Sequence, residues 1–257
     1  MKKFQKYQKK IKKYRSKLSK VKFKEKLNAL VSKVGIQYPV KFKLVDREIK
    51  EILFPCHLGI LFCGKFEVVL FEKTRNELER VFDSFFFDIR NLGEFNFSIK
   101  AFSKGIKSEY EEFDNSKKML EVHPTNKFYQ ILIDKRIENR LDLIIAVTDL
   151  PIYSSSNDNI AFLFGEAHLK HRCCVVSSLK LKEQFYNRPK NKNLFEQRII
   201  KEIIHEIGHL ILGLEHCNNE SCVMRYSGEI EEIDTKSFKL CEDCALKLKS
   251  VRANYNF

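Results

Sequence analysis

The sequence predicts an α/β fold: a mixed, mostly parallel twisted sheet, then a long helix and a small cysteine-containing C-terminal subdomain. Leu143–Val147 is a continuous apolar run of the kind found in strands buried on both faces. Isoleucines and leucines between Ile200 and Ile211 recur at helical spacing. Helix and strand patterns alternate along the chain, which favours a mainly parallel sheet with helices packed on it.

The remaining elements follow from periodicity and from turn residues. Before residue 193 we expect helices over the segment that ends near Val34, over Asn76–Phe87 and over Pro124–Asn139. Strands are expected at Val40–Val45, Phe66–Phe71, Phe95–Phe102 and Leu143–Val147, with two more between Asn159 and Ser178. Polar stretches predict loops at Ser103–Lys118, Ser154–Asn159 and Asn187–Asn193.

The composition fits one substantial core. The chain has 257 residues, 44% of them hydrophobic, and we expect residues 1–45 to form an extension and residues 46–257 a single domain. Within that domain we expect an N-terminal subdomain over 46–216 and a C-terminal subdomain over 217–257. No apolar run reaches membrane-spanning length, and the first residues lack the apolar core of a secretory signal. The sequence therefore predicts a cytoplasmic monomer without a transmembrane segment.

The basic charge is concentrated at the N-terminus. Residues 1–26 hold twelve lysines, Arg15 and only Glu25, and so carry +12 of the net charge of +13. One stripe of this segment is apolar at helical spacing, from Phe4 to Val21. The predicted basic helix could pack its stripe on the domain with a solvated basic face, or could contact a polyanion such as nucleic acid or an anionic membrane.

Two histidines and a glutamate lie close together on the long helix. His205 and His209 are four residues apart, so both imidazoles project from one helix face and can reach one cation. Glu206 need not be a ligand and is the candidate general base. Gly213 suits the end of the helix, after which His216 can approach as a third ligand. Three protein ligands leave a fourth position open, as in catalytic zinc sites, which predicts amide hydrolysis.

Four cysteines follow within 28 residues. Cys217 and Cys222 form one pair, and Cys241 and Cys244 form a second. Paired cysteines separated by a loop are typical of a closed zinc site with four thiolates. Two disulfides are the alternative, which the reducing environment of the cytosol disfavours. We expect Cys56, His57 and Cys63, and likewise His168, His171, Cys173 and Cys174, to be core or surface groups rather than further metal ligands.

The segment His205–Cys244 resembles the archaemetzincin family, the metzincin metallopeptidases with a second, four-cysteine zinc beside the catalytic one. Leu143–Tyr153, Phe162–Ala167 and Cys174–Leu179 also resemble the strands before the active-site helix of that family. The likeness covers about residues 140–245.

This resemblance implies a metzincin-like fold and two Zn²⁺ ions per chain. It implies that the catalytic zinc is bound by His205, His209 and His216, with Glu206 as general base and Met224 as the methionine of the Met-turn beneath the metal. The second, structural zinc would be bound by Cys217, Cys222, Cys241 and Cys244.

One departure from the metzincin pattern concerns the third histidine. Gly213 follows His209 by four residues rather than three, so the motif is one residue longer than usual. An extra helical residue turns the exit by about 100° and advances it by about 1.5 Å. Either the helix end absorbs the residue, or His216 meets the metal poorly. Tyr226, two residues after Met224, is expected to pack under the site rather than to contact the zinc or the transition state.

Two functions follow as hypotheses. The first is a zinc-dependent metallopeptidase acting on peptide or protein substrates. The second is a weakly catalytic or non-catalytic zinc-stabilised binding protein, directed to polyanions by residues 1–26. In the first case an exposed sheet edge could pair with an extended peptide, and Cys174–Leu179 is the candidate edge.

Overall fold

The computed structural model describes residues 55–96, 105–113, 116–156 and 162–254. The chain divides into two units, Met1–Lys43 and Leu44–Phe257, and every described residue belongs to the second. The basic segment 1–26, the helix expected to end near Val34 and the strand expected at Val40–Val45 lie outside the described residues.

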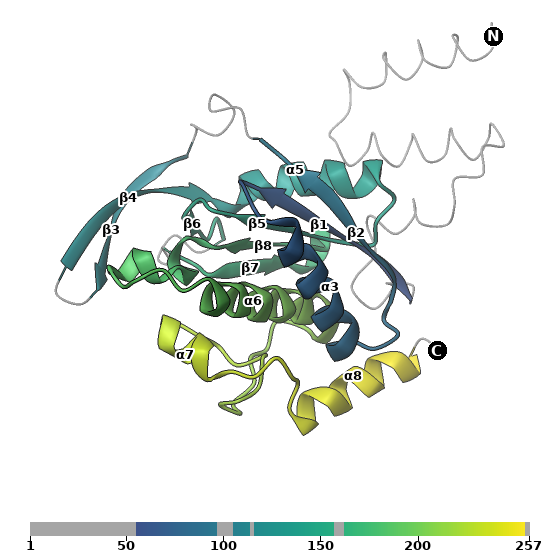
Figure 1. The fold of residues 1–257 in the computed structure, drawn as a ribbon. Coiled ribbons are helices and arrows are strands. Elements are labelled where there is room, and N and C mark those ends of the chain that lie inside the picture. Colours follow the sequence, from purple (N-terminus) through teal and green to yellow (C-terminus); the bar gives the residue numbers. More distant parts are fainter. Residues whose placement is uncertain (1–54, 97–104, 114–115, 157–161, 255–257) are drawn as a thin grey trace, which may run out of the picture. The chain divides into compact units, whose positions relative to one another are not determined.

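A five-stranded sheet forms the centre of the second unit (Figure 1). The strand order is β2-β1-β5-β8-β7, and all neighbours are parallel except β7 and β8. The strands are β1 (Cys56–Cys63), β2 (Phe86–Glu94), β5 (Leu143–Thr148), β7 (Gly165–His168) and β8 (Cys173–Ser177). The prediction of a mixed, mostly parallel sheet is confirmed, and every residue of β5 is buried, as its apolar run indicated.

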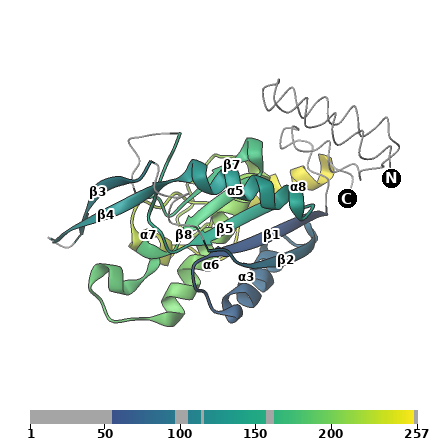
Figure 2. The same cartoon turned by 90° about the horizontal axis from the view of Figure 1, so that it is seen from above.

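Helices cover both faces of this sheet (Figures 1 and 2). α3 (Val68–Val81) and α6 (Lys192–Leu212) contribute to the larger hydrophobic core on one face. α5 (Thr125–Glu138) packs on the other face, in a second core that includes Phe128 and Leu132. The helix predicted to start at Pro124 is confirmed, with Pro124 as its N-cap.

The segment expected to be a strand at Phe66–Phe71 is instead the start of α3. Its buried residues Leu70, Phe71, Thr74 and Leu78 follow the i, i+1, i+4, i+8 pattern of one helix face. Val68 and Val69 are exposed. The apolar residues of Phe66–Phe71 suggested a strand, but only Leu70 and Phe71 among them are buried in the core.

A hairpin occupies the segment expected to be a charged loop, residues 103–118. β3 (Lys107–Phe113) pairs antiparallel with β4 (Ser116–Pro124), and β6 (Ile152–Tyr153) pairs parallel with β4. Residues of opposite charge face each other across the hairpin, as in the register pair Glu111 and Lys118. β3 and the first residues of β4 are mostly charged or polar, so hydropathy gave little sign of these strands.

Short elements complete the chain. The turns η3 (Leu169–His171), η4 (Leu179–Leu181) and η5 (Glu183–Tyr186) lie between β7 and α6 in sequence. α7 (Ile230–Thr235) and α8 (Glu242–Asn254) follow, and both pack on α6, on the side away from the sheet (Figure 1).

Across the described ranges, no helix is both long and apolar enough to cross a lipid bilayer.

Among the described strands, the sheet edge next to α6 is β7, not the strand expected from the sequence. β8 pairs with β5 on one side and with β7 on the other, so Cys174–Leu179 is not an edge. β7 precedes β8 in the sequence, but in the sheet it lies outside β8 and pairs antiparallel with it. The expectation was wrong because hydrophobic periodicity does not reveal the order of strands in a sheet.

Candidate metal centre

His205 and His209 lie one turn apart on α6, with their imidazole rings side by side. Their Nε2 atoms are 3.0 Å apart, and the ring centroids are 4.5 Å apart. Both residues are almost fully buried. α6 has the apolar face that the sequence predicted, so the core holds this helix and thereby fixes the direction of both rings.

Backbone carbonyls orient the two rings. His205 Nδ1 donates to Val223 O at 2.8 Å, and His209 Nδ1 donates to Gly213 O at 2.9 Å. A proton held at Nδ1 leaves the Nε2 lone pair free, as metal-binding histidines require. Burial lowers the pKa of His209 to about 4, and it lowers the pKa of His205 well below its usual value. Both rings are therefore neutral at pH 7 and available as ligands.

The helix end absorbs the extra residue of the motif. α6 ends at Leu212, and Gly213 adopts a φ of 101°, which favours glycine. The Gly213 amide donates to His209 O at 3.1 Å, so the chain leaves the helix immediately after this turn. His216 then returns to the cluster, its ring stacked on His205 at 5.3 Å and edge-on to His209 at 4.8 Å between centroids.

The three imidazoles fit a zinc ion. One nitrogen from each of His205, His209 and His216 lies within 4.8 Å of the others. Ligand nitrogens about 2.0–2.1 Å from a tetrahedral zinc would be roughly 3.3 Å apart, so only small adjustments are needed. Three nitrogen donors match the ligand number of catalytic zinc sites, which keep a fourth position for water or substrate.

Glu206 is buried beside these rings, and one of its oxygens has no partner. Oε2 makes no hydrogen bond with any of the described residues. Burial, followed by the nearby carboxylates of Glu202 and Glu166, raises the pKa of Glu206 well above its ordinary value. A Cβ added to Gly165 of β7 would lie 2.5 Å from Glu206 Oε1, so the carboxyl group packs directly against the edge strand. An unpaired buried carboxyl group at this place is suited to a water molecule or a substrate atom.

Met224 lies beneath the helix turn that carries the histidines. A Cβ on Gly208 would be 2.2 Å from Met224 Sδ, so the thioether occupies the space that Gly208 leaves. Met224 O accepts from the Cys217 amide at 2.9 Å, and the preceding carbonyl, Val223 O, orients His205. This segment therefore contacts both the histidine cluster and the cysteine cluster.

Replacing Gly208 by alanine is expected to destabilise the protein by about 1–3 kcal/mol, because the new methyl group would overlap the thioether. This loss exceeds the roughly 1 kcal/mol that alanine gains over glycine in a helix. Thermal unfolding measures the change, with Ser250→Ala on the exposed side of α8 as the control. Adding Met224→Ala should restore part of the stability. A Gly208→Ala protein as stable as the parent would show that the sulfur is not packed there.

Tyr226 is exposed rather than packed under the site, contrary to the expectation. Its ring lies edge-on to His216 at 5.2 Å between centroids, and 60% of the residue is accessible. It therefore stands at the solvent side of the histidine cluster.

The four predicted cysteines come together in the C-terminal segment. Their sulfur atoms lie within 4.8 Å of one another, and Cys217 Sγ is 3.5 Å from Cys241 Sγ. All four are free thiols. Amides approach the sulfurs, as when the Cys241 amide donates to Cys222 Sγ at 3.3 Å. Thiolates about 2.3 Å from a tetrahedral zinc would be roughly 3.8 Å apart, so this cluster also fits the metal.

Among the described residues, these two clusters are the groups that could hold a metal ion. The other cysteines, Cys56, Cys63, Cys173 and Cys174, are buried as free thiols. This placement agrees with the prediction that these cysteines are core or surface groups rather than metal ligands.

Two residues near the cluster were not found from the sequence. Lys236 has a fully buried side chain and pairs with Glu202 at 3.4 Å. After burial, its charge is the next cause of the low pKa of His216. Glu166 of β7 accepts from Tyr129 Oη at 2.5 Å and from Ser154 Oγ. Glu166 could have been found from the sequence, because a glutamate in the apolar run Phe162–Ala167 indicates a buried charged group. Lys236 lies in a polar stretch that gives no such indication.

The sequence profile of peptidase family M54 matches residues 57–250, which include both clusters. The chain belongs to peptidase family M54. Similar proteins include archaemetzincins: the one from Methanocaldococcus jannaschii is 41% identical over 123 residues, 48% of this chain and 66% of that protein. The one from Pyrococcus furiosus is 38% identical over 106 residues, 41% of this chain and 53% of that protein. The matched segments thus span between about half and two thirds of these relatives.

Solved structures share the fold. A zinc-dependent peptidase from Methanocorpusculum labreanum superposes with a TM-score of 0.58 at 22% identity, covering 74% of this chain and 99% of that one. The archaemetzincin of Methanopyrus kandleri gives 0.57 at 20% identity, covering 79% and 96%. That of Archaeoglobus fulgidus, complexed with malonate, gives 0.52 at 26% identity, covering 74% and 99%. The M54 chain therefore has the mixed α/β fold of archaemetzincins.

Proposed function

We propose that this protein is a zinc-dependent metallopeptidase that hydrolyses peptide bonds, with His205, His209 and His216 as ligands of a catalytic zinc. The observation that carries the proposal is the unpaired, buried carboxyl group of Glu206 beside three convergent imidazoles. Membership of family M54 supports the same reaction.

The roles of the residues follow from their positions. A zinc ion on the three imidazoles would polarise the substrate carbonyl and acidify a water molecule. Glu206 would orient that water, accept its proton at Oε2 and later release the proton to the departing amine. Burial raises the pKa of Glu206 above its ordinary value, which favours the protonated form that this carboxyl group would take up between the two proton transfers. Met224 would serve as the Met-turn methionine that supports the ligand-bearing turn from below.

The substrate would lie along β7. This strand is the open edge of the sheet next to Glu206, and Gly165 at its start is in contact with that side chain. An extended peptide can pair with the free backbone groups of an edge strand, which would bring its carbonyl to the zinc. Cys217, Cys222, Cys241 and Cys244 would hold a second, structural zinc, which would make two per chain.

Removing the metal tests the proposal. Incubation with a zinc chelator, followed by its removal, is expected to abolish the hydrolysis of a fluorogenic peptide mixture, because the carbonyl loses its activating charge. Adding Zn²⁺ should restore the activity, whereas Mg²⁺ should not, since Mg²⁺ prefers oxygen ligands. Hydrolysis that continues unchanged in the metal-free protein would contradict the proposal.

A further inference from the structure

A cavity lies at the other end of α6 from the histidine cluster. Its volume is about 300 Å³. It is lined by residues that directly follow β1, such as Phe66, by Asp149 directly after β5, and by the start of α6 with Phe195. Ten residues of α6 separate Phe195 from His205, about 15 Å along the helix, so this cavity is not part of the candidate metal centre.

The topology places this cavity at a switch point of the sheet. From β1 the chain crosses to β2 through α3 on one face, whereas it reaches β5 through α5 on the other face. β2 and β5 lie on opposite sides of β1. The connections therefore diverge between the carboxyl ends of β1 and β5. Open α/β sheets characteristically bind ligands in the crevice at such a point.

The charge balance of the cavity favours an anion. Lys192 is paired with Glu67 at 2.6 Å and lies 3.9 Å from Glu196, which also binds Lys73 at 2.5 Å. In contrast, within the described part of the chain Lys65, Lys182 and Lys190 have no carboxylate oxygen within 4.0 Å, and Asp149 is the lining carboxylate without a basic group within that distance. Three unpaired lysines against one aspartate leave the cavity with excess positive charge.

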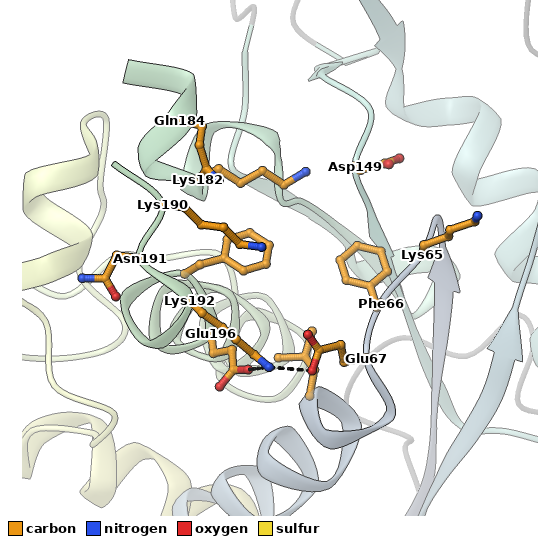
Figure 3. A pocket seen from close by; sticks show the side chains of 12 residues that line it. Lys65, Phe66, Glu67, Asp149, Lys182, Gln184, Lys190, Asn191, Lys192 and Glu196 are labelled. Atoms are coloured by element: carbon orange, nitrogen blue, oxygen red, sulfur yellow. Dashed lines mark hydrogen bonds and ion pairs between the residues drawn. The ribbon is translucent and has the colours of Figure 1, made fainter. Parts of the chain in front are cut away.

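Aromatic surface lies next to these amino groups. Figure 3 shows the side chains of Lys182 and Lys190 reaching toward the same space, with the ring of Phe66 beside it and the Glu67–Lys192–Glu196 ion pairs along another side. The Lys182 ammonium also lies over the ring of Phe195, 5.8 Å from its centroid. A ligand with a flat ring and a doubly charged anionic group would match both features.

We propose that this cavity is a binding site for a mononucleotide, with the phosphate held by Lys182 and Lys190 and the base against Phe66 and Phe195. The size of the cavity suits one such molecule, since ligand pockets begin at about 300 Å³. The Leu194 amide at the start of α6 is already bonded to the Asn191 side chain at 3.0 Å, so the lysines rather than the helix end supply the anion contacts.

Calorimetric titration of the full-length, zinc-loaded protein tests this site with adenosine 5′-monophosphate as the probe. We expect one binding event that weakens as salt is added, with adenosine and inorganic phosphate each binding at least about tenfold more weakly. The double variant K182A/K190A should weaken binding of the nucleotide by about tenfold or more, since charged hydrogen bonds are lost. K182R/K190R should retain it.

The control variant is K239A/K249A, which removes the same charge from exposed positions outside the cavity. Its affinity for the nucleotide should equal that of the parent. Zinc content and peptide hydrolysis should be unchanged in K182A/K190A, so a failure of this site is distinguishable from a failure of the peptidase assignment. The proposal is overturned if the parent does not bind the nucleotide, if K182A/K190A binds it as tightly as the parent, or if a longer oligonucleotide binds more tightly through the same lysines.

Discussion

Replacing Glu206 by glutamine is expected to lower kcat for peptide hydrolysis by about 10²–10⁴-fold while the zinc content stays the same. Glutamine has nearly the same shape, so it can keep the packing against Gly165. It cannot accept a proton from water. We expect the zinc to be retained because the proposed ligands are His205, His209 and His216, and Glu206 is not one of them. Steady-state kinetics and metal analysis of the same preparation measure both quantities.

The control for this substitution is Glu138→Gln on α5, across the sheet from the histidine cluster. Glu138 makes an exposed ion pair with Lys135, so its loss should change neither kcat nor stability appreciably. If Glu206→Gln hydrolyses peptides as fast as the parent, Glu206 is not the general base. If it loses its zinc, the effect on kcat would say nothing about proton transfer, and the assignment of the ligand set would be wrong.

Replacing Cys241 by serine is expected to reduce the zinc content from two per chain to one. Structural zinc sites bind with an apparent free energy of about 10–16 kcal/mol, and much of this stabilises the fold. The melting temperature should therefore fall by roughly 10 °C or more. The histidine cluster should also bind its zinc less tightly, because Cys217 directly follows His216 and its amide bonds to Met224 O.

The matched control is Cys63→Ser, which alters a buried thiol outside both clusters. It should lower stability without changing the count of two zinc ions, and so it separates general destabilisation from loss of a metal. A count of one in the parent would refute the second site. A count of two in Cys241→Ser would show that the cysteine cluster does not need this ligand.

The sequence was most informative where one local pattern determined the structure. β5 is apolar throughout because both of its faces are buried, and α6 is amphipathic over most of its length, so both were predictable. The spacing of His205 and His209 places two imidazoles on one helix face in any straight helix. The cysteine pairs are similarly local, and their sulfurs meet as expected.

Features that depend on distant contacts were not predictable. The order of β7 and β8 in the sheet is a property of the topology, and the sequence-based choice of edge was wrong for that reason. The buried pair of Lys236 and Glu202 joins residues 34 positions apart. The approach of His216 to the other two histidines depends on the turn at Gly213. From the sequence, the helix end could either absorb the extra residue or direct His216 away from the metal.

Within the described ranges, β2 and β7 are the edge strands of the five-stranded sheet, and they are protected from self-association in different ways. Unpaired strand edges can pair with another chain and so promote aggregation. The outer strand β2 is nine residues long, but it carries Asp88, Arg90 and Glu94 and pairs irregularly with β1. β7 has only four residues, and the side chain of its Glu166 accepts hydrogen bonds from Tyr129 and Ser154. If β7 accepts a peptide as proposed, charges or bulges cannot block this edge. The shortness of β7 would then be what keeps a second copy of the chain from extending the sheet there.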